Sequence, residues 1–126
     1  MKNKLKIEED TLMSVQYLKN IEFEKALSLT DLVAYQEGQV VSRTLVQNSG
    51  VGVTLFAFDK GEQISSHASK GDAMLTVLEG KAKITIGEKD YLVKAGETIV
   101  MPNSIPHAVY AEEQFKMHLT VVFPYK

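Results

Sequence analysis

Three histidines and no cysteine leave imidazole as the main side chain available for metal binding, proton transfer or ligand contact. His67 comes six residues after a glycine turn at Gly61, and His107 follows a proline turn at 102–106. Each lies where a loop leads back into an extended run. We expect His118, on the polar side of an alternating run, to be exposed on an outer sheet face. His67 and His107 are therefore the candidates for chemistry.

Other kinds of site are not expected, because the sequence lacks residues or motifs that they require. Without cysteine there is no disulfide framework, zinc ribbon or thiol nucleophile. Ser69 lies two residues after His67, but no Gly-x-Ser-x-Gly elbow accompanies it, so acyl transfer is not expected. The glycines at 50–52 lack the third glycine and the following helix of a phosphate-binding loop, and they are typical of a hairpin turn. We expect Glu79 to be a solvated charge at a strand end.

Composition limits the class of protein. The chain has 126 residues, 44% of them hydrophobic and 24% charged, with a net charge of −2, which fits one globular domain without a basic surface for nucleic acid. No apolar run reaches the ~18 residues of a membrane span. Lysines near the N-terminus are followed by no apolar stretch, so we expect no secretory signal and a cytoplasmic protein. Neither nucleic acid nor membrane is an expected partner.

Short β-rich runs alternate with turn residues from position 40 onward. This spacing of strands predicts an all-β sandwich or barrel. The predicted strands are 40–46, 51–58, 74–78, 82–86, 91–94, 98–101, 108–110 and 115–123.

The segment before these strands has a different spacing of apolar residues. Leu12, Val15, Leu18 and Ile21 recur at spacings of three, which favours a short helix. We therefore divide the single domain into an N-terminal arm or edge segment (1–36), packed on the barrel, and the barrel itself (37–126).

Alternation within two of the runs predicts which face is buried. In 82–86 and 115–121, apolar residues alternate with lysine, threonine and histidine, so one face is covered and the other is wet. The candidates for the apolar wall of an internal pocket are Val77, Ile84, Ile86, Met101, Met117 and Leu119.

Six positions resemble the two short motifs of the cupin superfamily. Gly61, His67 and Gly80 match the first motif, and Gly96, Pro102 and His107 match the second, with the 15 residues of 81–95 between them. The resemblance implies a small single-domain jelly-roll β-barrel (a double-stranded β-helix) with its pocket inside. It also implies a homodimer, in which the apolar N-terminal third would cover a neighbour's sheet edge.

The sequence departs from these motifs at the metal-binding positions. Family metal sites hold Mn, Fe, Ni, Cu or Zn with three histidines and a glutamate, whereas here Ser69 replaces the second histidine and Ala73 the glutamate. Ser104 and Ala111 replace the glycine and the asparagine of the second motif. Asp72, the nearest carboxylate, is one residue off register, which places it on the opposite face of a strand.

Two interpretations of the site stay open. In one, neutral His67 and His107 line a polar barrel interior and contact a small molecule, together with Ser69, Met101 and Met117. In the other, the same two histidines hold a divalent transition metal weakly, helped by a side chain outside the motifs. The first predicts a small-molecule-binding cupin and the second a metal-dependent dioxygenase, isomerase or lyase. A purely structural or regulatory protein is a third possibility.

Overall fold

Turns at glycine and proline divide the chain into short strands, and the computed structural model describes them over residues 15–124. Within this range the strands follow one 3-10 helix, η1 (Leu29–Leu32). The strands are β1 (Val40–Gln47), β2 (Val51–Phe58), β3 (Gln63–His67), β4 (Asp72–Glu79), β5 (Lys81–Ile86), β6 (Lys89–Lys94), β7 (Thr98–Met101), β8 (His107–Tyr110) and β9 (Phe115–Val122).

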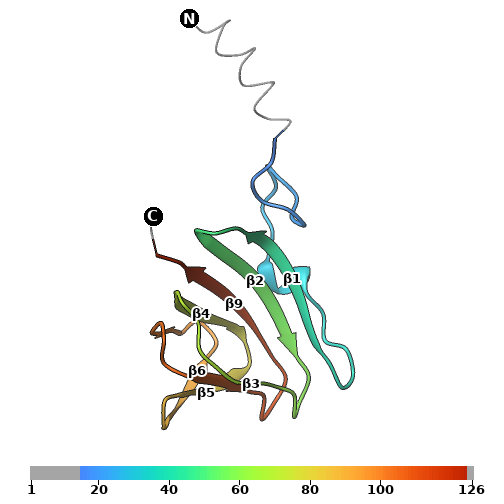
Figure 1. Cartoon of the computed structure of the whole chain (residues 1–126). Coiled ribbons are helices and arrows are strands. Elements are labelled where there is room, and N and C mark those ends of the chain that lie inside the picture. Colours follow the sequence, from blue (N-terminus) through green and yellow to red (C-terminus); the bar gives the residue numbers. More distant parts are fainter. Residues whose placement is uncertain (1–14, 125–126) are drawn as a thin grey trace, which may run out of the picture.

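The strands form two antiparallel sheets that face each other. One sheet has the order β1-β2-β9-β4-β7 and the other the order β3-β8-β5-β6 (Figure 1). Five of the seven neighbouring pairs join strands that are not consecutive in sequence, as when β9 lies between β2 and β4, and these crossovers build a jelly-roll barrel. The predicted all-β jelly-roll fold is confirmed.

Apolar side chains from both sheets fill the space between them. At one end of the barrel, Phe58 and Phe115 stack with ring centroids 4.5 Å apart. Leu75, Val77 and Ile84 are fully buried beside them. Because aromatic and branched side chains fill this end, it is a packed core rather than a cavity.

A second apolar cluster lies on the outer face of the five-stranded sheet. Residues of the N-terminal segment, including Val33, pack there against Leu45, Leu55 and Ala57. The outward residues of 115–121, which were predicted to be wet, are half-buried where they lie beside β2, so that prediction is wrong for Lys116, His118 and Thr120. Alternation of apolar and polar residues within one strand cannot reveal that another segment, here the N-terminal one, covers its outer face.

Three side chains fasten this N-terminal segment to the sheet. The Tyr35 hydroxyl donates to Glu79 Oε2 at 2.6 Å, and the Lys116 ammonium lies 5.0 Å from the centre of the Tyr35 ring. Lys116 also donates to the Thr30 carbonyl at 2.6 Å. Glu79 is half-buried in this arrangement, so the expectation of a solvated charge is wrong.

Two elements differ from the sequence prediction. The expected helix does not form at Val15, Leu18 and Ile21, which lie in bends, while Leu12 falls outside the described residues. Strand β3 was not predicted, because Gln63–His67 is polar and exposed at four of its five positions and so shows no alternation. No helix within residues 15–124 is long and apolar enough to cross a bilayer.

Candidate functional site

Strands β3 and β8 bring His67 and His107 together at the end of the barrel opposite the phenylalanine stack. The two residues are direct partners in the antiparallel pairing, and a register shift between Ile64 and His67 adjusts the alignment. Their rings meet edge to face, with centroids 4.5 Å apart and planes at 63°. Two histidines forty positions apart in sequence thus form one adjacent pair, which we call the histidine pair.

Backbone carbonyls orient both rings in the same way. His67 Nδ1 lies 3.0 Å from the Ser65 carbonyl, and His107 Nδ1 lies 3.3 Å from the Ile105 carbonyl. A carbonyl oxygen only accepts, so each Nδ1 carries the proton and donates it. In the neutral form of either imidazole, Nε2 then has a free lone pair that can accept a hydrogen bond or bind a metal.

The two rings differ in their exposure. His107 is only 5% exposed, whereas His67 is open to solvent. Burial lowers the pKa of His107, and the neighbouring His67 lowers it further, against the opposing effect of the Ile105 carbonyl. His107 is therefore neutral at pH 7, with Nε2 as an acceptor.

The two loops beside the histidine pair are tied to each other. The Ser104 amide donates to the Ser69 carbonyl at 2.7 Å, and the Ser69 hydroxyl accepts from the Gly71 amide at 3.1 Å. Gly71 itself lies so close to β9 that a Cβ there would be 2.5 Å from the Val122 carbonyl oxygen. Ser69 is half-buried, so the hydroxyl proton that it does not use locally can still be donated.

The two methionines predicted to contact a ligand lie at different depths. Met101 pairs with Ala73 at the end of the sheet near His67 and His107, and it is 2% exposed. Met117 pairs with Val77, four residues further along β4 toward the Phe58–Phe115 stack, and is 1% exposed within the core. Leu119 and Val121, the next inward positions of β9, are half-buried. Met101 thus lies near the histidine pair, whereas Met117 lies deeper, in the packed apolar core between the sheets.

The donor atoms present do not fit a metal held in the manner of the cupin motifs. No three His, Asp or Glu side chains within residues 15–124 are grouped closely enough to hold an ion. Asp72 is exposed, and its Oδ1 accepts from the Asn103 amide at 2.8 Å and from Asn103 Nδ2 at 2.9 Å. Transition-metal sites normally use three or four protein ligands, so two Nε2 atoms leave the coordination incomplete.

His118 does not belong to this site. It lies on the outer face of β9, between Leu55 of β2 and Thr76 of β4. Its location on the outer face agrees with the prediction, but it is half-buried rather than exposed, and burial lowers its pKa. The difference arises because the outer face is partly covered.

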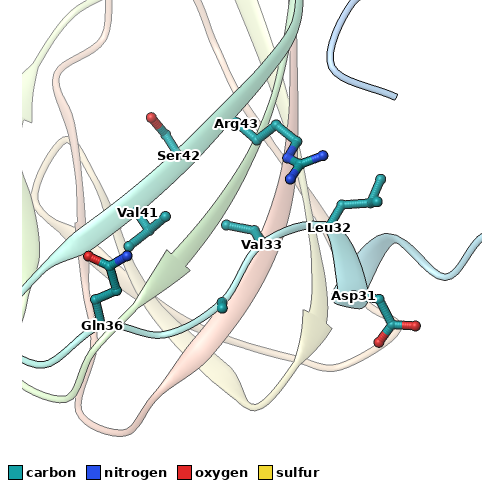
Figure 2. A pocket seen from close by; sticks show the side chains of 8 residues that line it. Asp31, Leu32, Val33, Gln36, Val41, Ser42 and Arg43 are labelled. Atoms are coloured by element: carbon teal, nitrogen blue, oxygen red, sulfur yellow. The ribbon is translucent and has the colours of Figure 1, made fainter. Parts of the chain in front are cut away.

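A separate hollow of about 260 Å³ lies outside the barrel, between residues 31–36 and strand β1. Figure 2 shows Arg43 beside Val33 and Leu32, while the Asp31 carboxylate points away from them. The Arg43 guanidinium donates to the Asn20 carbonyl at 2.9 Å. The charged groups around this hollow do not converge on one point, so the histidine pair remains the better candidate.

Sequence reasoning missed the two carbonyls that orient the rings. Each histidine binds the backbone oxygen two residues before it, at Ser65 and Ile105. Every residue has a backbone carbonyl, so the residue type does not indicate which carbonyl accepts a hydrogen bond. The only available signal was the identical position of both histidines at the point where a loop enters a strand.

Comparison with known proteins agrees with this architecture. A family model described as a cupin domain matches residues 54–123, so the chain belongs to the cupin family. The conserved SPY1581 protein of unknown function from Streptococcus pyogenes is 50% identical (TM-score 0.88), covering 90% of this chain and 99% of that one.

Two further solved structures are similar. A cupin superfamily protein from Desulfitobacterium hafniense is 30% identical (TM-score 0.82), covering 86% of this chain and all of that one. A cupin 2 conserved barrel domain protein from Leptotrichia buccalis is 46% identical (TM-score 0.73), covering 74% of this chain and 45% of that one. No curated protein is significantly similar to the chain.

Proposed function

We propose that this cupin binds a small molecule at the open end of its barrel, with Nε2 of His67 and Nε2 of His107 as the polar contacts. The observation that carries the proposal is the histidine pair, in which both rings are held by carbonyls through Nδ1 and both keep Nε2 free. Ser69 borders the same end and supplies a hydroxyl, and the buried Met101 packs beneath that end as part of the apolar core. A few convergent polar groups beside apolar side chains are typical of ligand sites.

The protonation state of His107 indicates which ligand chemistry suits the site. Neutral His107 offers an acceptor, and no lysine or arginine makes a hydrogen bond or ion pair with either ring within residues 15–124. A ligand hydroxyl or amino group can donate to these acceptors at no cost in proton uptake. A carboxylate ligand would first require His107 to gain a proton, which its burial opposes.

Thermal unfolding in the presence of small metabolites tests this proposal. A ligand at one hundred times its Kd stabilises the native state by about 2.7 kcal/mol, which raises the Tm measurably. We expect hydroxylated or amino compounds to raise the Tm at pH 7.5 more than carboxylic acids do. No shift with any compound of a broad panel would contradict the proposal.

Three histidine variants then locate the binding site. We expect H67A and H107A to weaken binding of the best compound at least tenfold in calorimetry, because each removes one acceptor. H118A is the matched control, since this histidine lies on the outer face of the barrel. Equal weakening by H118A would place the ligand elsewhere.

A metal-dependent dioxygenase, isomerase or lyase is the second candidate, favoured by the two free Nε2 atoms. Elemental analysis of untagged protein after dialysis separates it from the first. A stoichiometric metal that H67A abolishes would support the metal enzyme. A metal content that is negligible, with a Tm unchanged by a chelator, would support binding without metal.

A further inference from the structure

Arg43 of β1 is the only arginine in the chain, and it is half-buried. Within residues 15–124, the ion pairs join Lys25 with Glu22 and Lys83 with Asp90, so no carboxylate of this range pairs with Arg43. A partly buried charge is costly unless an opposite charge compensates it. The guanidinium is therefore a candidate for binding an anionic ligand.

Hydrogen bonds to the N-terminal segment fix the orientation of this guanidinium. Arg43 Nη1 donates to the Asn20 carbonyl at 2.9 Å. Asn20 is held in turn, because its Nδ2 donates to the Thr44 carbonyl at 2.8 Å and the preceding Lys19 amide donates to the Leu45 carbonyl at 2.8 Å. An arginine has five N–H donors, so most of them can still bind a ligand, and their direction is set before it arrives.

The guanidinium borders the hollow of about 260 Å³ outside the barrel, which we call the outer hollow. Figure 2 shows Arg43 beside Leu32 and Val33, and Val41 lines the hollow from the same face of β1 as Arg43. Asp31 is the single carboxylate among the lining residues, and it points away from them. The outer hollow thus presents one positive charge beside an apolar wall.

Both walls of the outer hollow are fixed by contacts outside it. The N-terminal segment is fastened where Tyr35 donates to Glu79 and Lys116 donates to the Thr30 carbonyl, each at 2.6 Å. Val33, between these two fastenings, is 4% exposed. The opposite wall is β1, which is paired with β2 from end to end. Because both walls exist before a ligand arrives, binding costs little ordering of the chain.

We propose that the outer hollow binds a small monocarboxylate with an apolar tail. The Arg43 guanidinium pairs with the carboxylate, since its planar fork matches two carboxylate oxygens. Leu32, Val33 and Val41 contact the tail. At ~30 Å³ for each water-sized group, 260 Å³ accommodates roughly nine non-hydrogen atoms, which is the size of benzoate.

The composition of the outer hollow favours a carboxylate over a phosphate. A phosphate carries up to about two negative charges and has no apolar part, so one arginine would balance only part of its charge. The apolar wall would then contact a hydrated anion, which is unfavourable. A carboxylate with a hydrocarbon tail uses both features of the hollow.

This site is separate from the histidine pair. Arg43 pairs with Leu55, whose side chain belongs to the apolar cluster on the outer face of the five-stranded sheet. His67 and His107 lie on the other sheet, at the open end of the barrel. Binding at the outer hollow therefore neither requires nor excludes the ligand proposed for the histidine pair.

Nuclear magnetic resonance titration of the ¹⁵N-labelled protein tests the proposal. Since the chain has one arginine, its Nε–H gives a single side-chain signal that reports on the outer hollow alone. We expect benzoate to shift this signal with a Kd of about 1 mM, ordinary for so small a ligand. Benzamide, which has the same shape without the charge, should bind at least tenfold more weakly. No shift of the arginine signal, or equal affinity for both compounds, would overturn the proposal.

Two variants of the outer hollow and one control then locate the ligand. We expect R43Q to weaken benzoate binding at least tenfold. Q36E should weaken it several-fold, because the exposed Gln36 lines the hollow and a carboxylate there competes for Arg43. Q36E also keeps the test valid if R43Q fails to fold. K83Q is the matched control, since it removes one positive charge from the other sheet and should leave binding unchanged. Undiminished binding by Q36E or by folded R43Q would contradict the proposal.

The pH dependence separates the outer hollow from the histidine pair. A guanidinium stays charged, so benzoate binding should be constant between about pH 6 and 8. A carboxylate bound by the histidine pair would instead bind more tightly as the pH falls, because the imidazoles gain protons. Tightening at low pH with shifts of the histidine signals would place benzoate at the histidine pair and overturn the proposal. Inorganic phosphate that binds more tightly than benzoate would show that the apolar wall plays no part and would overturn it too.

Discussion

The two ends of the barrel each carry a pair of neighbouring rings, supplied by different sheets, and they have opposite properties. At one end Phe58 and Phe115 stack and are fully buried. At the other end, His67 and His107 meet at the same 4.5 Å between ring centroids, with one of the two rings open to solvent. We call them the phenylalanine end and the histidine end.

The comparison assigns different roles to the two ends: stability to the first and the proposed ligand binding to the second. Apolar burial at the phenylalanine end contributes to stability, and the two stacked rings there are fully buried. The histidine end leaves polar atoms available and buries less apolar surface. Substitutions should therefore act mainly on folding at the first end and mainly on binding at the second.

The largest effect is expected for F115A. Removing a fully buried ring leaves a cavity next to Phe58, and such truncations cost about 3–5 kcal/mol in the free energy of unfolding. Urea denaturation measures the change. Y110A is the control, because Tyr110 is 38% exposed and its truncation should cost less than about 1 kcal/mol. Comparable losses for both variants would show that the phenylalanine end does not dominate stability.

The next largest loss of stability is expected for G80A, which changes the turn that closes the phenylalanine end. Gly80 has a φ of 75°, and a Cβ there would clash with the Gln114 carbonyl oxygen and with Phe115. Strain and the clash together should cost more than about 2 kcal/mol.

The variant G96A separates the contribution of backbone strain to the stability loss from that of the Cβ clash. Gly96 has a φ of 88°, but a Cβ at this position would meet no atom within 4 Å, so G96A should cost only about 1 kcal/mol. Urea midpoints of the two variants give the comparison. Equal losses would mean that backbone conformation alone, and not packing against β9, explains the glycine at position 80.

At the histidine end, S104G should stabilise the protein. Ser104 has a φ of 65°, a conformation that glycine adopts without strain, so the substitution should gain about 0.5 kcal/mol. S66G is the control of opposite sign, because Ser66 lies in strand β3, where glycine is unfavourable. A loss of stability in S104G would show that its contact with Asn103 Oδ1 outweighs the relief of strain.

Much of the fold could be predicted from the sequence, because turn residues and alternating apolar positions specify most strands directly. β2 and β7 begin and end at the predicted residues. β3 could not be found, since its side chains are polar on both faces. The Tyr35–Glu79 contact could not be found either, because it joins positions 44 residues apart that show no common pattern.

The candidate site was only partly accessible to the same reasoning. The resemblance of Gly61, His67 and His107 to the cupin motifs implied two histidines in one barrel, and the structure brings those two rings together. Their orientation depends on the Ser65 and Ile105 carbonyls, which residue types do not encode. Whether the pair binds a ligand stays a prediction.

The smallest expected effect is a pH dependence that originates at the histidine end. Burial lowers the pKa of His107 below its ordinary 6.5, so the unfolded chain binds a proton that the folded one resists. The stabilising contribution of the neutral ring is therefore complete above pH 6.5 and is lost as the pH falls below that value. We expect the Tm of wild type to fall more between pH 7.5 and 5.0 than the Tm of H107N.

The remaining groups with lowered pKa values do not obscure this difference. His118 is present in both proteins, and Asp59 and Asp72, whose pKa values hydrogen bonds lower, titrate below this range. F115A offers the matching test at the other end, since it should lower the Tm equally at both pH values. If H107N loses as much stability as wild type on acidification, the titrating group is not His107, and the two ends differ in packing alone.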